Sequence, residues 1–252
     1  MFTTMRAAPL LCSALLLAGC ASAPGSTTDK DRLEGFNRSM YKFNDTIDRA
    51  ALKPVAKGYR KVTPSFVQAG VGNVLSNLEY PSTALNQFLQ GKWGLGFRDT
   101  GRFLLNSTLG VAGLFDVATP VGLEKNDEDF GQTLAVWGVP SGPFLYLPLF
   151  GPSTLRDSSS LAVGWVTNPL EYTDAPWEAE WGLRGLGIVH GRSQLLPLDD
   201  TLQRTYDPYA FIRDAWLQQR KYNVFDGNLP PETLDEEFME EGEDAEAAPP
   251  AQ

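Results

Sequence analysis

The residue types that support catalysis occur in this sequence without the spacing that catalysis requires. His190 is the only histidine in the 252 residues, and a general base needs a nucleophile within hydrogen-bonding reach. Ser141 lies in the run Gly138-Val139-Pro140-Ser141-Gly142, one place too late for a Gly-x-Ser-x-Gly elbow. We therefore interpret His190 as structural and expect that the chain is not an enzyme.

Cofactor and metal motifs are missing in the same way. Gly94, Gly96 and Gly101 have the wrong spacing for a dinucleotide-binding loop. The acidic run Asp127-Glu128-Asp129 is able to hold a cation, but carboxylates are also favoured at the positive N-terminal end of a helix, and we favour that interpretation. We expect no cofactor, no metal site and no catalytic residue.

Cys20 is the residue with the most specific chemistry. It follows Leu17-Ala18-Gly19, an apolar stretch over residues 10–16 and the basic Arg6, which is the layout of a secretory signal peptide. A cysteine directly after the cut is typical of a bacterial lipoprotein signal. We expect cleavage of residues 1–19 and acylation of Cys20, because two or more acyl chains anchor a protein stably where one does not. The alternative is an ordinary signal peptide with a chance cysteine.

Composition divides the remaining chain into three parts. Residues 20–32, which are rich in Ser, Thr, Pro and Gly, are expected to tether the lipidated cysteine to the body flexibly. Residues 33–225 are expected to form one domain. Residues 226–252 carry ten acidic and no basic residues, which predicts a disordered tail. Residues 21–225 are almost neutral, and since they show no basic stripe we expect no nucleic-acid partner.

Apolar spacing predicts that the body is helical. Phe36, Met40, Phe43 and Ile47 recur at helical spacing, and Pro54 is expected to end or bend their helix. Caps, prolines and glycines predict further helices over residues 65–78, 81–91, 93–105, 174–191 and 209–222. Alternating strand patterns are scarce, so we predict an all-α fold with a single domain.

One apolar stretch is rich in helix-breaking residues. Residues 130–155 carry no charge, and a straight helix of that length would reach about 39 Å, beyond the ~30 Å hydrocarbon core of a bilayer. Its four prolines and four glycines exclude one continuous helix. Irregular backbone is tolerated at membrane depth only where protein or water satisfies it. We therefore expect a re-entrant hairpin packed on the helices, with a Pro-rich core loop of a soluble protein as the alternative.

The body carries a series of short motifs in a fixed order. They are Leu33-Glu34-Gly35-Phe36-Asn37-Arg38-Ser39-Met40-Tyr41-Lys42-Phe43-Asn44, Lys53-Pro54-Val55-Ala56, Gly58-Tyr59-Arg60, Arg102-Phe103-Leu104-Leu105-Asn106-Ser107-Thr108-Leu109-Gly110, Gly113-Leu114-Phe115-Asp116-Val117-Ala118, Asp129-Phe130-Gly131-Gln132-Thr133-Leu134, Gly138, Gly142-Pro143, Leu147-Pro148, Gly151, Leu155-Arg156-Asp157 and Asp207-Pro208-Tyr209. This series resembles the MlaA (VacJ) outer-membrane lipoproteins from about Leu33 to Phe225, and one departure is Arg32, where the family often has proline.

The resemblance implies a ring of helices embedded in the inner leaflet of the outer membrane, on its periplasmic face. It implies a central amphipathic channel that takes phospholipids from the outer leaflet, trimeric porins as partners, and a soluble periplasmic lipid carrier as acceptor. The alternative function is a structural lipoprotein that binds porins without conducting lipid. Ala21 after the lipidated cysteine agrees with outer-membrane sorting.

Two groups of residues are expected to line or close such a channel. Asn106, Ser107 and Thr108 are candidates for its polar lining, although they are equally able to satisfy neighbouring backbone. Gly138 and Gly151 are interpreted as hinges or as turn formers. The expected gate is the uncharged hairpin, with Gly138, Pro140, Gly142, Pro143, Phe144, Tyr146, Leu147, Pro148, Phe150 and Gly151 as its candidate residues.

Overall fold

The computed structural model describes residues 31–229. Cys20, the expected signal peptide and most of the expected tether and acidic tail lie outside the described residues. The helices are α1 Glu34–Ile47, α2 Lys53–Val62, α3 Ser65–Leu89, α4 Trp93–Thr108, α5 Phe130–Val136, α6 Ser159–Thr167, α7 Trp177–Leu195, α8 Asp199–Arg204 and α9 Pro208–Val224, and the strands are β1 Phe144–Leu147 and β2 Gly151–Thr154.

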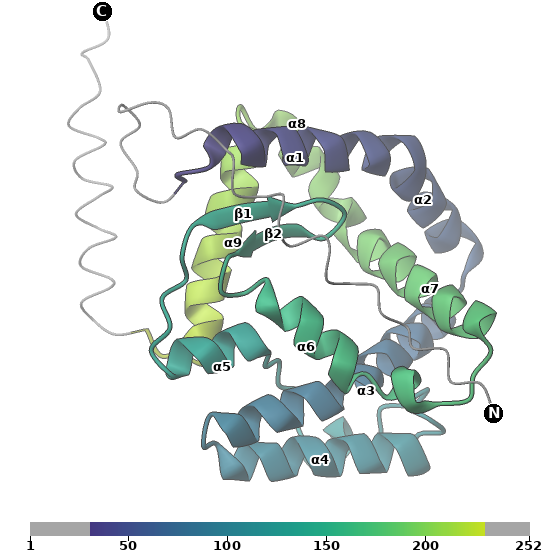
Figure 1. Ribbon diagram of the computed structural model, residues 1–252. Coiled ribbons are helices and arrows are strands. Elements are labelled where there is room, and N and C mark those ends of the chain that lie inside the picture. The colour runs from purple at the N-terminus through teal and green to yellow at the C-terminus, as the bar shows by residue number, and fades with distance from the viewer. Residues whose placement is uncertain (1–30, 230–252) are drawn as a thin grey trace, which may run out of the picture.

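The elements form a closed ring (Figure 1). Contacts lead from α1 through the short π-helix η1, Asp48–Leu52, to α2, from α2 to α7, on to α3, α5 and α9, and from α9 through the strands β2 and β1 back to α1. Helix α4 packs along α3 on the outside of this circuit, and α6 lies toward the middle of the view. The prediction of an all-α, ring-like domain is therefore confirmed, with one pair of short strands inside it.

The chain changes direction between α1 and α2, at a bend near Pro54. The apolar stripe of α1 runs to Ile47, five residues of π-helix follow as η1, Asp48–Leu52, and α2 then places Pro54 in its first turn. Helical backbone continues from η1 into α2, so Pro54 removes one backbone hydrogen bond and crowds the preceding turn, which bends the helix. Of the two expected outcomes at Pro54, the bend is the one observed.

Helix α3 differs from the prediction of two separate helices. It runs unbroken through Pro81, which was expected to start a new helix. Proline inside a helix costs about 3 kcal/mol. Side chains on both sides of it are buried, including Tyr80, Ala84 and Gln87, and α4 packs along α3. This continuous packing outweighs the cost of the proline.

The expected hairpin is present, and its two arms pair as antiparallel strands. Phe144 is opposite Thr154 and Leu147 is opposite Gly151. Two further backbone hydrogen bonds, from Leu155 to Pro143 and from Arg156 to Ser141, extend the pairing beyond the strands. The turn at residues 148–150 exposes Leu149 and Phe150.

Burial in the described residues is inverted relative to an ordinary globular domain. Seven apolar side chains are buried there, against sixteen polar or charged ones that include Asn37, Asp99 and Arg102. Five of the six tryptophans are between 45 % and 68 % exposed. Water-soluble domains usually bury their large apolar side chains and keep charged groups outside. The outer surface of this ring therefore suits an apolar medium.

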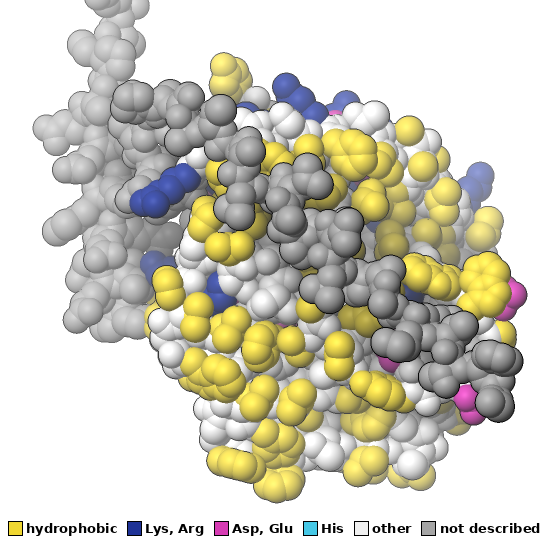
Figure 2. Space-filling model, in the orientation of Figure 1, with side chains coloured by type: hydrophobic (Ala, Val, Ile, Leu, Met, Phe, Trp, Pro, Cys, Tyr) yellow, Lys and Arg dark blue, Asp and Glu magenta, His cyan; other side chains and the backbone are white. Residues whose placement is uncertain are grey.

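The exposed apolar side chains cover a wide area. Figure 2 shows them over the lower part of one face, where α4, α5 and α6 lie, among uncharged neighbours. They include Trp93, Phe97 and Leu104 on α4. None of the helices between residues 31 and 229 combines the length and the apolar character that crossing a membrane requires.

Candidate functional site

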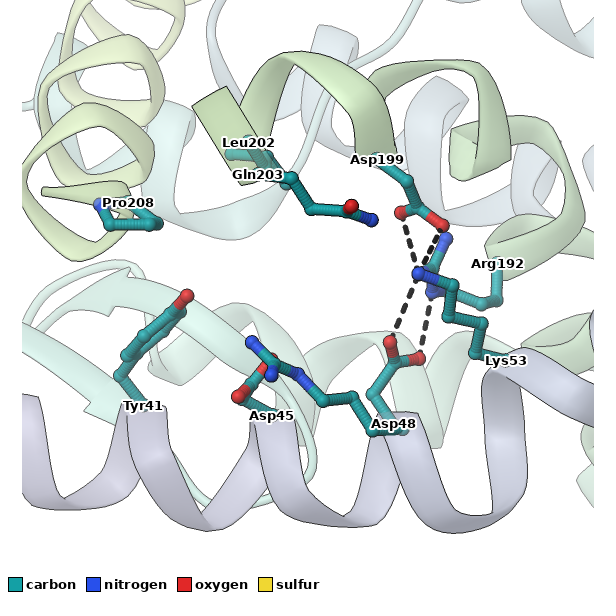
Figure 3. A pocket seen from close by; sticks show the side chains of 10 residues that line it. Tyr41, Asp45, Asp48, Lys53, Arg192, Asp199, Leu202, Gln203 and Pro208 are labelled. Carbon is teal, nitrogen blue, oxygen red and sulfur yellow. Dashed lines mark hydrogen bonds and ion pairs between the residues drawn. The ribbon is translucent and has the colours of Figure 1, made fainter. Parts of the chain in front are cut away.

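A polar pocket of about 580 Å³ opens between α1, η1, the starts of α2 and α9, α7 and α8 (Figure 3). Three acidic and three basic side chains line it, so that its formal charge is balanced. The lining residues are Tyr41, Asp45, Asp48, Arg49, Lys53, Arg192, Asp199, Leu202, Gln203 and Pro208. These residues come from both ends of the domain and meet because the ring closes on itself.

One end of the pocket is a chain of ion pairs centred on Arg192. Its Nε and Nη2 donate to the two carboxylate oxygens of Asp48 at 2.7 and 2.9 Å, and Nη2 also reaches Asp199 at 2.8 Å. Lys53 lies 2.9 Å from the same Asp199. Burial favours the neutral acid, but Lys53 and Arg192 outweigh it and hold the pKa of Asp199 below its ordinary value. Asp199 is therefore charged at neutral pH.

The other end of the pocket borders the hairpin through an aromatic contact. Tyr41 lines the pocket, and its ring meets the ring of Tyr146 on β1 edge to face, with centroids 5.6 Å apart. Burial first, and then the neighbouring Tyr41 and negative charges, raise the pKa of Tyr146 to about 12. Tyr146 is thus a neutral phenol in direct contact with the pocket wall.

Two asparagines of α1 hold the hairpin to the ring. Asn37 donates to the carbonyl of Phe144 at 3.0 Å and accepts from the N–H of Tyr146 at 2.8 Å. Asn44 does the same one step further on, donating to the carbonyl of Leu147 at 2.9 Å and accepting from the N–H of Leu149 at 2.8 Å. Each side-chain amide makes the hydrogen bonds that a neighbouring strand would otherwise make. Helix α1 therefore satisfies the backbone N–H and C=O groups on the free edge of β1.

The base of the hairpin is fixed by Arg220 of α9. Its Nη1 and Nη2 donate to Asp129 at 2.6 and 2.7 Å, and Nη2 also reaches Asp157 at 2.8 Å. Asp129 is at the same time the N-cap of α5, accepting from the N–H of Gln132. Asp127-Glu128-Asp129 is therefore a helix start, as favoured from the sequence, and no cluster of potential ligands able to hold a metal occurs in the part of the chain that the structure describes.

The candidate gate residues are distributed along the hairpin. Phe144 and Tyr146 point inward into the small apolar cluster around Tyr209, whereas Phe150 is exposed at the turn. Pro140 and Pro148 are exposed, while Pro143 and Leu147 are half-buried beside the paired strands. The hairpin glycines Gly138, Gly142 and Gly151 all have positive φ, at 85°, 68° and 83°.

A positive φ is what a turn former needs, since other residues adopt it at a cost. Gly138 follows Trp137, the C-cap residue of α5, and the N–H of Val139 returns to the carbonyl of Leu134 as at many helix ends. Gly151 takes the chain from the turn into β2. The interpretation of these glycines as turn formers fits this geometry; their role as hinges stays a prediction.

The candidate polar lining residues are used largely inside the protein. Asn106 is buried, and its carbonyl oxygen accepts from the N–H groups of Val117 and Ala118. Ser107 accepts from Asn77 at 2.9 Å, and the exposed Thr108 donates to the backbone of its own helix. None of the three lines the pocket of Figure 3, and Asn106 satisfies neighbouring backbone, which was the alternative interpretation.

His190 connects three helices. Its Nδ1 lies 3.2 Å from the hydroxyl of Tyr59 on α2, and its Nε2 packs against the backbone at Gly72 on α3. Burial lowers the pKa of His190, which keeps the ring neutral. This packing agrees with the structural interpretation of this residue.

The pocket itself was not predicted. Its charged residues lie on separate helices between positions 45 and 199, and no short motif relates them. The available signal was the group of charges at Asp45, Asp48, Arg49 and Lys53, two acidic residues followed by two basic ones on one face of a bent helix.

Comparisons with known proteins agree with this architecture. The family model described as MlaA lipoprotein matches residues 29–223. The intermembrane phospholipid transport system lipoprotein MlaA of Escherichia coli is 37 % identical over 243 residues, which cover 90 % of this chain and 92 % of that protein. An uncharacterized protein of Rickettsia typhi is 37 % identical over 196 residues, covering 77 % of this chain and 78 % of that protein.

A solved structure, described as the structural basis for maintenance of bacterial outer membrane lipid asymmetry, superposes with a TM-score of 0.68 at 36 % identity. The match covers 79 % of this chain and 99 % of that one. The resemblance found in the sequence motifs is thereby confirmed, and the chain belongs to the MlaA lipoprotein family.

Proposed function

We propose that this protein is a non-enzymatic lipoprotein of the outer membrane that removes phospholipids from the outer leaflet and passes them through its ring toward the periplasm. The inverted burial carries this proposal: an apolar perimeter surrounds buried polar side chains and a charged pocket. The names of the Escherichia coli relative and of the solved structure, which refer to phospholipid transport and to lipid asymmetry, support it.

The perimeter suits contact with lipid tails. Exposed apolar patches larger than a few hundred Å² are rare on soluble monomers and mark interaction surfaces. Exposed tryptophans, such as Trp93, Trp137 and Trp177, are favoured where an aromatic ring is partly in lipid and partly in water. Half-immersion in one leaflet would need no helix that crosses the bilayer.

The pocket and the hairpin supply what a moving phospholipid needs. A headgroup needs polar partners along its path, because burying a charge without a partner is costly. The charged pocket offers such partners, and the hairpin lies beside the pocket through the contact between Tyr41 and Tyr146. We therefore keep the hairpin as the proposed gate, with Tyr146 as the gate residue nearest the pocket.

Membership of the family supports a proposal for the location and the partners of this protein. We propose that acyl chains on Cys20 hold the protein on the periplasmic face of the outer membrane, that trimeric porins contact its apolar perimeter, and that a soluble periplasmic carrier accepts the lipid. No energy source is visible in the chain, so the direction of transport is set by the lipid gradient or by these partners.

A crosslink tests the gate directly. Tyr41→Cys with Tyr146→Cys, bridged by a short thiol-specific crosslinker in a strain that lacks the native gene, joins the hairpin to α1. Trp165→Cys with Trp181→Cys is the matched control, because those rings are 6.1 Å apart but belong to α6 and α7. We expect only the first crosslink to raise phospholipid in the outer leaflet and sensitivity to detergent with EDTA.

The outcomes separate conduction from scaffolding. Equal behaviour of both crosslinked proteins would refute the gate. If deletion of the whole protein left outer-leaflet phospholipid unchanged, the transport function would fail, and a structural, porin-associated lipoprotein would be the better account.

A further inference from the structure

We propose that the pocket of Figure 3 binds the headgroup of a zwitterionic phospholipid, with the phosphate at Arg192 and Lys53 and the ammonium at Asp45 and Tyr41. This inference rests on the proposed lipid transport and names its preferred substrate class. It is argued from the charge balance of the pocket, from its two chemically different ends and from its contact with the hairpin.

The side chains proposed to bind the phosphate have hydrogen-bond donors that are not used within the described protein. Arg192 uses Nε and Nη2 for Asp48 and Asp199, but its buried Nη1 has no hydrogen-bond partner among the described residues. A buried, unsatisfied donor of a charged group is costly, so an acceptor is favoured there. The ammonium of Lys53 has three donors and carries one ion pair, with Asp199. A phosphate oxygen is the acceptor that both groups bind well.

The ammonium end lies one helical turn away. Asp45 precedes Asp48 by three residues, about 4.5 Å along the axis, a separation that a short bridge between phosphate and ammonium spans. Asp45 pairs with Arg49 at 2.9 Å, but the Arg49 side chain is 71 % exposed, and exposed pairs are weak. A ligand ammonium is therefore able to compete for Asp45, while the adjoining ring of Tyr41 attracts cations through its face.

The charge balance favours a zwitterion over an anion. Asp45, Asp48 and Asp199 already offset Arg49, Lys53 and Arg192. A headgroup with one phosphate and one ammonium leaves this balance unchanged, whereas an anionic headgroup adds an uncompensated negative charge to a partly buried site.

Lipid competition tests the preference. The full-length protein in detergent is equilibrated with vesicles of equal parts phosphatidylethanolamine and phosphatidylglycerol, and the bound lipids are quantified by mass spectrometry. We expect the native protein to prefer phosphatidylethanolamine about fivefold, which corresponds to one partly exposed charge contact of about 1 kcal/mol. Asp45→Asn should remove most of this preference, and Lys53→Gln should lower total binding while raising the ratio.

Two control variants make the same change of charge outside the pocket. Asp200→Asn lies beside Asp199 on α8, and Lys57→Gln lies one turn beyond Lys53 on α2; both side chains are exposed. We expect both controls to keep the native lipid ratio. If Asp45→Asn shifted the ratio no more than Asp200→Asn, or if the native protein bound the two lipids equally, the headgroup site would be refuted.

The clearance of outer-leaflet phospholipid in cells is measured in parallel. Intact clearance without any headgroup preference overturns this inference and leaves the transport function standing. A clear preference with no clearance supports the headgroup site and overturns the transport function.

Discussion

Asn37 and Asn44 are seven residues apart on α1 and make the same pair of hydrogen bonds to backbone groups that are three residues apart on the hairpin. Seven residues of α-helix rise about 10.5 Å, and three residues of a strand extend about 10 Å. The two repeats match, so a helix is able to serve as the neighbour of an edge strand. Such an edge would otherwise expose unpaired backbone groups.

Removing either amide should release its own part of the hairpin. In Asn44→Ala the N–H of Leu149 loses its acceptor, and in Asn37→Ala the N–H of Tyr146 does. We expect faster hydrogen exchange at the matching amide in each variant, with a larger loss of stability for the fully buried Asn37, about 1–3 kcal/mol. Unchanged exchange at both amides would show that the pairing of β1 with β2 holds the hairpin in place without the two asparagines.

Arg220 should be among the most sensitive positions for stability. Arg220→Met leaves Asp157 and Asp129 without their shared cation, and breaking a buried pair on one side costs about 3 kcal/mol or more. Thermal unfolding in a fixed detergent measures the effect. Arg49→Met, which removes only an exposed pair, is the control and should melt close to the native protein.

The same network should make the protein sensitive to acid. Burial alone would raise the pKa of Asp157, but hydrogen bonds from Arg220 and Arg156 outweigh it and lower the pKa below the ordinary value. A group with a lowered pKa in the folded state stabilises at neutral pH and loses that contribution below about pH 4. Melting curves from pH 7 to pH 3 should show this loss in the native protein and a smaller one in Arg220→Met.

Gly131 should tolerate no side chain. A Cβ added there would lie 2.5 Å from Nη2 of Arg220 and 2.9 Å from the Cα of Asp157, so Gly131→Ala would push apart the ion pair at the base of the hairpin. We expect a loss of about 1–3 kcal/mol. Gly182→Ala on α7 has open space around its Cβ and should stabilise by about 0.5–1 kcal/mol. Equal melting temperatures would contradict this packing argument.

The helices were predictable because their signals are local. The stripe of Phe36 and Met40, the proline at 54 and the cap at Asp207 each act within one or two turns, and each is found where expected. The continuity of α3 was not predictable. It depends on residues far along the chain that pack on both sides of Pro81, and spacing within the helix does not contain them.

The pocket was not predictable from the sequence for a related reason. Asp48 and Arg192 form one ion pair across 144 residues, and only the closure of the ring brings them together. Apolar periodicity also predicts which residues share one face of a helix, but not whether that face is buried. Phe36 and Phe43 belong to the predicted stripe, yet both are exposed. Whether such a stripe faces a core or a lipid phase depends on what the rest of the fold buries.

The ring is joined twice between its first and last helices. One joint is the hairpin; the other is direct, since Arg38 of α1 binds Asp207 through two hydrogen bonds of 2.6 and 3.1 Å and lies over the ring of Tyr209. Because α1 and α9 are joined at two places, the ring stays closed when one of the two contacts is broken. The direct contact through Arg38 therefore keeps α1 and α9 joined without the hairpin, so the movement proposed for the hairpin would leave the ring closed.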